Sequence, residues 1–413
     1  MKRLVVSGRA VSVCAAVMLL SGCGGVQSNL AVPGTVPARE GASNFVRVTR
    51  IEPQATEKVL YSFGAGYDGA NPYATLIDVK GTLYSTTEYG GAHGDGTVFS
   101  LTPNGSEKVL HSFGSGTDGA YPQSSLIDVN GALYSTTEYG GAQGDGTVFS
   151  ITSRRREKVL YAFSGTDGGD PSSSLIDVHG VFYGTTFSYG TYGSGTVFST
   201  TTSGKEKVLH SFAGGPGDGA GPGGGLVDVN GSLYGTTYFG GAYGSGTIFS
   251  LTAGGKEKVL HSFGSGTDGV YPTDSLVNIK GTLYGTTVQG GKYAYCRVSR
   301  SGFAGCGAVF RITTDGEEKL VYSFSDTDGA NPQGVIDVKG KLYGTTGAGG
   351  ASGLGTVFSL TMGGTEKVLH SFSGGPGDGA NPIATVADVA GILYGTTLNG
   401  GANGLGTVYT LTP

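Results

Sequence analysis

Two neighbouring segments of the chain carry acids that the rest of the chain does not repeat. These segments are Glu88-Tyr89 with Asp95 and Glu138-Tyr139 with Asp145. Two carboxylates that flank a glycosidic bond act as acid and base in glycan cleavage when they converge and one pKa is raised. The acids and tyrosines therefore indicate a ligand site or the site of a polysaccharide lyase or hydrolase. Recent duplication of one loop is the alternative explanation.

A single long insertion, residues 292–306, gathers aromatic and cationic side chains in one loop. Its candidate ligand-binding residues are Tyr293, Tyr295, Arg297, Arg300 and Phe303. Rigid aromatic rings offer contact area at a low cost in entropy, and functional residues concentrate on loops held by a rigid scaffold. We expect this loop to contact a glycan or an anionic partner, with a merely decorative surface loop as the alternative.

The histidines give no metal-ligand pattern of their own. His111, His210, His261 and His370 occupy one position of a repeated strand, where a radial fold keeps them apart. The chain also lacks zinc-type spacing and a nucleophilic-serine elbow. We therefore expect no metal site and no cofactor, and the sequence assigns no catalytic residue.

The N-terminus has the features of a secretion signal. Lys2 and Arg3 precede an apolar run that is too short to span a membrane, and Leu20-Ser21-Gly22-Cys23 closes it. This tetrad resembles a bacterial lipobox, in which Cys23 is lipidated. We expect a lipoprotein signal peptide at 1–22, the lipidated cysteine with a flexible tether at 23–44, and outer-membrane sorting. Ordinary signal cleavage beside a chance cysteine is the alternative.

Secretion also decides how the remaining cysteines are interpreted. Of the four cysteines, Cys14 leaves with the signal and Cys23 carries the lipid, so Cys296 and Cys306 remain as a pair within one loop. In an oxidising compartment such a pair forms a disulfide, and the loop has no histidine to support a metal site.

Composition restricts both the fold and the partners. The 413 residues include 80 glycines and 14 prolines, and 38% of the residues are hydrophobic. This combination is typical of many short strands joined by glycine turns. The net charge of -5 provides no basic surface for nucleic acid. We expect a monomer whose partners are the membrane, through the lipid anchor, and a polysaccharide or an envelope protein.

The elements that must position these residues come from a repeat of about 50 residues. Seven copies fill residues 45–413 and begin at 57, 107, 157, 206, 257, 318 and 366. One copy predicts strands over 107–113, 125–129, 132–137 and 147–152, with Asn130-Gly131 as a hairpin turn. Glycine interrupts most windows that are long enough for a helix.

Seven four-stranded units predict an all-β fold, a seven-bladed β-propeller with antiparallel blades. A β-solenoid is the rival, but it needs parallel stacking, which hairpin turns do not give. The chain also stops at Pro413, just before another outer strand is due. We expect the N-terminal strand to pair with the C-terminal blade and close the ring.

Acids present in nearly every copy suggest two further interpretations. The Asp-Gly pairs are expected to bond their own turns. Six inner-strand aspartates either line the channel as a cation-attracting ring or accept hydrogen bonds from the neighbouring blade, and we favour the second. These aspartates are Asp78, Asp128, Asp177, Asp228, Asp337 and Asp388.

Residues 206–257 carry the pattern Leu-Tyr-Gly-Thr-Thr, Gly-Gly, Gly-Thr-Ile-Phe, Glu-Lys-Val-Leu-His-Ser-Phe and Asp-Gly. This pattern resembles the GloVer tandem repeat, and the blades are loosely similar to NHL-type blades. The resemblance implies an extracytoplasmic protein with one of several anchors, and it implies no enzyme activity.

Three functions are consistent with these features. We favour a non-catalytic, lipid-anchored binding scaffold of the cell envelope for a glycan or protein. The alternatives are the lyase or hydrolase that uses the unrepeated acids, and a structural surface component without a ligand.

Overall fold

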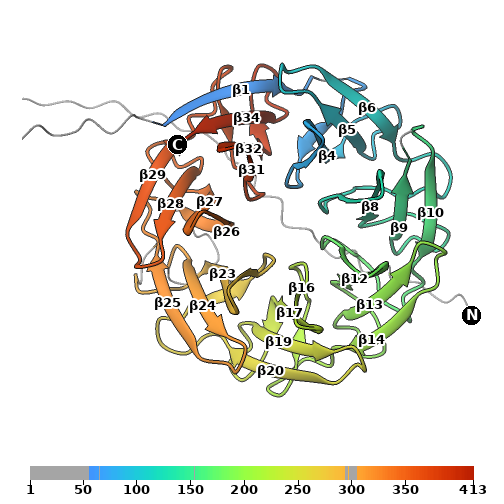
Figure 1. The fold of residues 1–413 in the computed structure, drawn as a ribbon, viewed down its shortest axis with the longest axis vertical. Coiled ribbons are helices and arrows are strands. Elements are labelled where there is room, and N and C mark those ends of the chain that lie inside the picture. Colours follow the sequence, from blue (N-terminus) through green and yellow to red (C-terminus); the bar gives the residue numbers. More distant parts are fainter. Residues whose placement is uncertain (1–54, 65, 153, 294–295, 297–304) are drawn as a thin grey trace, which may run out of the picture. The chain divides into compact units, whose positions relative to one another are not determined.

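The computed structural model describes residues 55–64, 66–152, 154–293, 296 and 305–413. These residues form seven blades around a central axis, and each blade is a sheet with four successive antiparallel strands (Figure 1). A fifth short strand joins two of these sheets, and two further sheets have two strands each. Among them no helix is long and apolar enough to cross a bilayer. The predicted seven-bladed propeller is confirmed. The signal peptide, Cys23 and the tether are predictions that lie outside the described residues.

The strands follow one order in every blade, from the axis outward. The innermost strands are β3 (Ile77–Val79), β7 (Ile127–Val129), β11 (Ile176–Val178), β16 (Val227–Val229), β22 (Val277–Ile279), β26 (Ala330–Val338) and β31 (Ala387–Val389). The second strands are β4 (Thr82–Tyr89), β8 (Ala132–Thr137), β12 (Val181–Thr186), β17 (Ser232–Thr237), β23 (Thr282–Gln289), β27 (Lys341–Ala348) and β32 (Ile392–Thr397).

The outer half of each blade is equally regular. The third strands are β5 (Thr97–Leu101), β9 (Thr147–Ile151), β13 (Thr196–Thr201), β19 (Thr247–Thr252), β24 (Ala308–Thr313), β28 (Thr356–Thr361) and β34 (Thr407–Thr412). The outermost strands are β6 (Glu107–Ser112), β10 (Glu157–Ala162), β14 (Lys207–Ser211), β20 (Glu257–Ser262), β25 (Glu318–Ser323), β29 (Glu366–Ser371) and β1 (Thr56–Ser62). Short added strands are β2 (Ala70–Pro72), β15 (Gly219–Ala220), β18 (Phe239–Gly240), β21 (Val270–Pro272), β30 (Gly379–Ala380) and β33 (Asn399–Gly400).

Ring closure joins the two ends of the repeat region. Strand β1 pairs antiparallel with β34, with Glu57 opposite Leu411 and Tyr61 opposite Val408. The last blade therefore takes its outermost strand from the start of the repeats, as predicted. This pairing covers the edge that β34 would otherwise expose.

Aromatic side chains make the core between blades. Phe63 follows β1 of the seventh blade and packs edge-on against Phe99 of the first, with ring centroids 5.2 Å apart. Phe113, which follows the outermost strand of the first blade, makes the same contact with Phe149 of the second blade at 5.0 Å. All four rings are fully buried. Each aromatic pair thus joins two sheets, so the core is a chain of contacts between blades.

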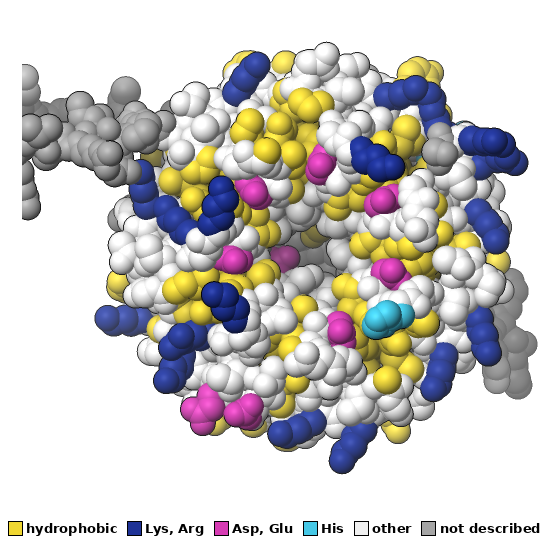
Figure 2. All heavy atoms as spheres, viewed as in Figure 1, with side chains coloured by type: hydrophobic (Ala, Val, Ile, Leu, Met, Phe, Trp, Pro, Cys, Tyr) yellow, Lys and Arg dark blue, Asp and Glu magenta, His cyan; other side chains and the backbone are white. Residues whose placement is uncertain are grey.

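The repeated acids bond within their own turns. Asp68 accepts the Gly64 N–H at 2.8 Å, and the other six Asp-Gly loops make equivalent bonds, which confirms that prediction. The preference for bonds between the inner-strand aspartates and neighbouring blades is wrong for most of them. Asp78 accepts the N–H of Gly81 in its own hairpin turn at 2.9 Å, because that turn presents a free donor three residues later. Asp177, Asp228, Asp337 and Asp388 do the same. Acidic side chains surround the central opening on the face drawn in Figure 2.

Candidate functional site

A hollow of the propeller lies around its axis. It is a pocket of about 290 Å³, and its walls are the segments that lead into the innermost strands of the seven blades. Each inner strand runs from such a segment to its hairpin turn. The pocket therefore opens on the face opposite to those turns. We call this hollow the axial pocket.

Hydroxyl and amide groups dominate the wall of the axial pocket. Serines 124, 125, 172, 173, 174 and 275, with Thr75, Thr273, Gln123 and Gln333, line it. Tyr73, Phe187 and Tyr238 supply aromatic rings. Asp274 is the one charged side chain among the described lining residues. The pocket can thus exchange many hydrogen bonds with a polar, uncharged ligand.

A left-handed residue before a proline turns each segment into the pocket. Tyr121 has a φ of 54° and donates its N–H to the Asp95 carbonyl of the preceding blade at 2.8 Å. Asp170 has the same φ and bonds Asp145 in the same way at 3.1 Å. Residues other than glycine rarely adopt this backbone conformation, and the hydrogen bonds between blades hold it in place.

Hydrogen bonds between consecutive blades fix the pocket wall. The Thr75 N–H donates to Ser125 Oγ at 3.1 Å, and the Ser125 N–H donates to Ser174 Oγ at 3.2 Å. Behind this wall, Thr236 donates to the Asp274 carbonyl at 3.3 Å, and other blades have an equivalent threonine. Because both sets of bonds cross from blade to blade, the pocket keeps its shape only in the closed ring.

Asp274 is the most unusual group in the pocket. Its Oδ2 is shielded from water and has no hydrogen-bond partner. Burial raises the pKa of the Asp274 carboxyl to about 7. The carboxyl lies against Gly334 of the sixth blade, where an added Cβ would be 3.1 Å from Asp274 Cγ. At neutral pH this group can therefore either donate or accept a hydrogen bond to a ligand.

Two of the four unrepeated acids meet beside the pocket. Gln123 Nε2 donates to Glu88 Oε1 at 3.2 Å and to Glu138 Oε2 at 2.6 Å. Burial raises the pKa of both carboxyls, and that of Glu138 reaches about 7 with Asp170 and Glu88 nearby. Gln123 itself lines the axial pocket, so the acid pair stands at its wall.

The other two unrepeated acids lie elsewhere. Asp95 accepts a hydrogen bond from the Tyr121 phenol and lies against Gly114, in the loop that follows β6. Asp145 lies against Gly165 and Gly169 in the corresponding loop after β10. The sequence alone did not distinguish the two glutamates from the two aspartates, because all four acids belong to one segment that the first two copies share.

Tyrosine rings flank the acid pair. Tyr121 lies between Tyr89 and Tyr139, with centroids 5.3 and 5.9 Å away. Tyr89 and Tyr139 are 39% and 42% exposed, so their faces are open to a ligand. A second aromatic group lies across blades four and five, where Tyr238 stacks on Tyr271 at 4.8 Å beside the 44%-exposed Phe239.

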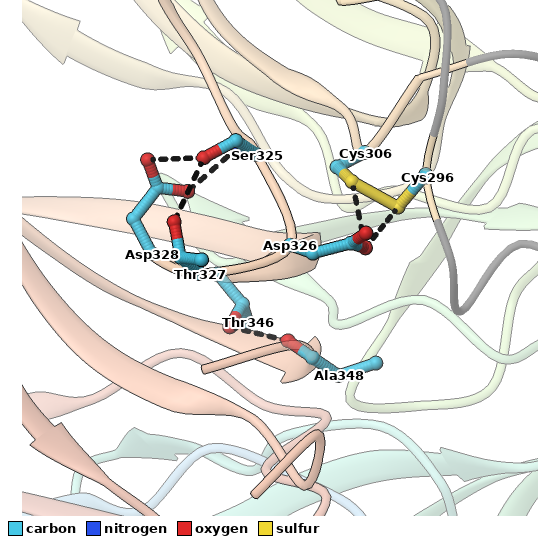
Figure 3. The surroundings of a disulfide bond; sticks show 8 residues. All are labelled: Cys296, Cys306, Ser325, Asp326, Thr327, Asp328, Thr346 and Ala348. Carbon is cyan, nitrogen blue, oxygen red and sulfur yellow. Dashed lines mark hydrogen bonds between the residues drawn. A yellow bond between two sulfur atoms is a disulfide. The ribbon is translucent and has the colours of Figure 1, made fainter. Parts of the chain in front are cut away.

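The insertion holds the predicted disulfide. Cys296 and Cys306 are bonded, and their sulfur atoms lie 3.1 and 3.3 Å from Asp326 Oδ1 (Figure 3). The Cys306 carbonyl accepts the Asn331 N–H at 2.9 Å, so the loop base has the same bond between blades as Tyr121. Tyr293 is 47% exposed. The other candidates of this loop, Tyr295, Arg297, Arg300 and Phe303, lie outside the described residues.

The sequence analysis did not single out Gln123 or the segments after the prolines as a site. A signal was present for Asp274, because alanine, serine or glycine fills its position in the other six copies, whereas the position of Gln123 varies from copy to copy. The sixth copy is also one residue shorter after Pro332, so one strand, β26, replaces the two separate strands of the first blade.

The fold and the pocket define a seven-bladed β-propeller with a polar axial pocket. The chain belongs to the Gloeobacter/Verrucomicrobia repeat family, which matches residues 34–186, 108–299 and 293–413. The family resemblance seen in the repeat is thereby confirmed. No curated protein matches the sequence.

Solved structures share the fold at low identity. A puromycin hydrolase is 10% identical with a TM-score of 0.50, covering 82% of this chain and 52% of its own. A gluconolactonase from Xanthomonas campestris is 12% identical with a TM-score of 0.43, covering 87% and 89%. A luciferin-regenerating enzyme is 13% identical with a TM-score of 0.43, covering 87% and 95%. These likenesses concern the fold alone.

Proposed function

We propose that this protein is a carbohydrate-binding propeller of the cell envelope and that its axial pocket holds the sugar. The observation that carries the proposal is the pocket wall, in which hydroxyl and amide groups from consecutive blades surround one protonatable carboxyl, Asp274. Its volume of about 290 Å³ is at the small end of ligand pockets, which span roughly 300–1,000 Å³. One or two sugar rings match that size.

The aromatic groups extend the site beyond the pocket. Tyr238 lines the pocket and stacks on Tyr271, and Gln123 links the pocket wall to the acid pair flanked by Tyr89 and Tyr139. Aromatic faces combine apolar area with little loss of side-chain entropy. A polysaccharide chain can therefore be held in the pocket and along exposed rings on either side.

A pocket-filling substitution tests the proposal. Ser172 lines the pocket and makes no hydrogen bond described above, so Ser172→Trp fills the hollow without breaking the wall. We expect glycan affinity on an array of envelope polysaccharides to fall at least about tenfold. Ser203→Trp, in an exposed outer turn, is the matched control and keeps full affinity. Equal affinity of both variants would contradict the pocket as the binding site.

A second candidate function, glycan cleavage, rests on the acid pair. Glu88 and Glu138 share one amide donor, and a carboxyl with a pKa of about 7 can act as a general acid at neutral pH. In this case Glu138→Gln abolishes release of reducing ends from a bound polysaccharide while binding persists. If the unmodified protein leaves every bound polysaccharide intact, binding without catalysis is its function.

Envelope anchoring completes the proposed function. The lipobox-like tetrad ending at Cys23 supports lipidation and outer-membrane sorting. Mass spectrometry of the N-terminal peptide and membrane fractionation test this, with Cys23→Ala as the comparison. We expect the unchanged protein in the membrane fraction and the variant outside it; equal distribution would remove the anchor from the proposal.

A further inference from the structure

Two clusters of metal-binding side chains lie between blades, apart from the axial pocket. The first contains His210 on β14, Asp218 in the following loop and Glu257 on β20 of the next blade. The second contains His370 on β29, Asp378 and Glu57 on β1. In each cluster one nitrogen or oxygen from every residue lies within 4.8 Å of the others.

The acids of each cluster are held in place before any ligand arrives. Asp378 Oδ2 accepts the Ser373 N–H and hydroxyl, both at 2.7 Å, while Oδ1 lies 3.1 Å from His370 Nε2. Asp218 Oδ2 accepts the Ala213 N–H at 2.8 Å, with Oδ1 3.4 Å from His210 Nε2. Metal-binding carboxylates commonly have such outer hydrogen bonds, which fix their orientation.

The glutamate of each cluster has an unpartnered oxygen, a feature that it shares with the equivalent glutamate of every copy. Glu257 Oε1 and Glu57 Oε1 are shielded from water and make no hydrogen bond. A buried carboxylate oxygen without a partner costs free energy, and a cation placed between the three side chains would remove that cost. Two carboxyl groups and an imidazole also provide the oxygen and nitrogen ligands that a divalent cation takes.

The two clusters share a local structure that the other five copies lack. Each has a Gly-Gly-Pro-Gly-Asp-Gly loop, which places the aspartate eight residues after the histidine. A two-residue strand pair, β15 with β18 or β30 with β33, secures each loop. In the copies of His111 and His261, the aspartate follows the histidine by seven residues. Among the described residues, the glutamate of the next blade does not complete a comparable cluster there.

We propose that these two clusters are binding sites for a first-row divalent cation such as Zn²⁺, which links adjacent blades by coordinating side chains of both. Imidazole with two carboxylates suits this class of ion, and the half-exposed edge of each cluster leaves a position for water. The second site includes Glu57 on the closing strand β1, so its ion ties that strand to the sixth blade. The expectation of no metal site did not consider contacts between each histidine and carboxyl groups of its own loop and of the adjacent blade.

The repeat supplies a matched test. Tyr61, Tyr161 and Tyr322 occupy the histidine position in three copies, where the phenol donates to the aspartate of its own loop. His210→Tyr and His370→Tyr should therefore fold while losing the imidazole ligand. Zn²⁺ is titrated by calorimetry into chelator-treated, tag-free protein. We expect two sites, one in each single variant and none in the double variant.

His111→Tyr and His261→Tyr are the controls and should keep both sites. Added Zn²⁺ should also raise the Tm of the unchanged protein and leave that of the double variant unmoved. The proposal is overturned by the absence of saturable binding, by two sites persisting in the double variant, or by an equal loss in the controls. None of these outcomes depends on carbohydrate binding.

Discussion

The Thr396 hydroxyl donates a hydrogen bond to the carbonyl of Ala74 across 3.3 Å, which joins the last blade to the first. The same bond from Thr345 to the Ala384 carbonyl is shorter, at 2.8 Å. Both threonines are buried, so each bond crosses a water-free boundary between blades. This threonine–carbonyl hydrogen bond therefore supports the pocket wall, and between the last and first blades it adds to the strand pairing that closes the ring.

Removing these hydroxyls should destabilise the protein unequally. Thr345→Val leaves the Ala384 carbonyl without this donor, and we expect the free energy of unfolding to fall by about 1–2 kcal/mol. Thr396→Val should cost about half as much, because Ser85 also donates to the Ala74 carbonyl at 3.0 Å. Urea unfolding measures both values, with the exposed Thr202→Val as the control. The reverse order would contradict the assigned roles.

Stability should fall as the pH rises through neutrality. Burial, followed by the nearby Asp68, raises the pKa of Glu107 from 4.5 to about 7. A carboxyl with a raised folded-state pKa holds its proton more tightly when folded, so its contribution is present at pH 4.5 and lost as the pH passes 7. Glu107→Gln should therefore stabilise the protein by about 1–2 kcal/mol at pH 8, after allowance for solvent screening, and change little at pH 5.

The measurement for this prediction is chemical unfolding at both pH values. Glu317→Gln, at an exposed position of an outer turn, serves as the comparison for the effect of the substitution itself. A gain for Glu107→Gln that is equal at pH 5 and pH 8 would show that its proton is not linked to folding.

Gln123 should control the titration of the two acids beside the pocket. Its amide stabilises the charged forms of Glu88 and Glu138, so Gln123→Leu should raise both carboxyl pKa values further. Carbon-detected NMR titration of glutamate carboxyls gives the shift directly. Gln289→Leu, outside this pair, provides a reference in which the two pKa values stay unchanged.

Reduction of the disulfide should loosen the insertion without opening the ring. Cys296 and Cys306 are 10 residues apart, and closing a loop of that length contributes at most about 2–3 kcal/mol. We expect a reductant to lower the free energy of unfolding within this range. The double variant Cys296→Ser, Cys306→Ser should show no response to reductant, and a response would assign the effect to another group.

The architecture was predictable because its determinants are local and repeated. Turns such as Asn130-Gly131 place both residues at positive φ, 56° and 82°, which fixes an antiparallel hairpin. The absence of an outer strand after Tyr409 then identified the closing partner. Seven repetitions of such a pattern leave few alternative topologies.

The site was less predictable because its residues come from separate segments and, in part, from neighbouring blades. Gln123 and the glutamates it joins come from three different segments, and no spacing rule places them together. Asp274 differs from its counterparts in the other copies, yet its burial depends on Gly334 in the next blade. The partners of His210 and His370 likewise come from the Asp-Gly loops and the adjacent blade.

The pairing of β1 with β34 also imposes an order on biosynthesis. The first strand of the ring leaves the ribosome before its partner, and its partner is the last of the described strands to be made. A chain that ends early has no place to dock β1 and keeps two open sheet edges. Only a chain that includes β34 can hide both edges, so the closing pair distinguishes closed rings from chains that end before that strand.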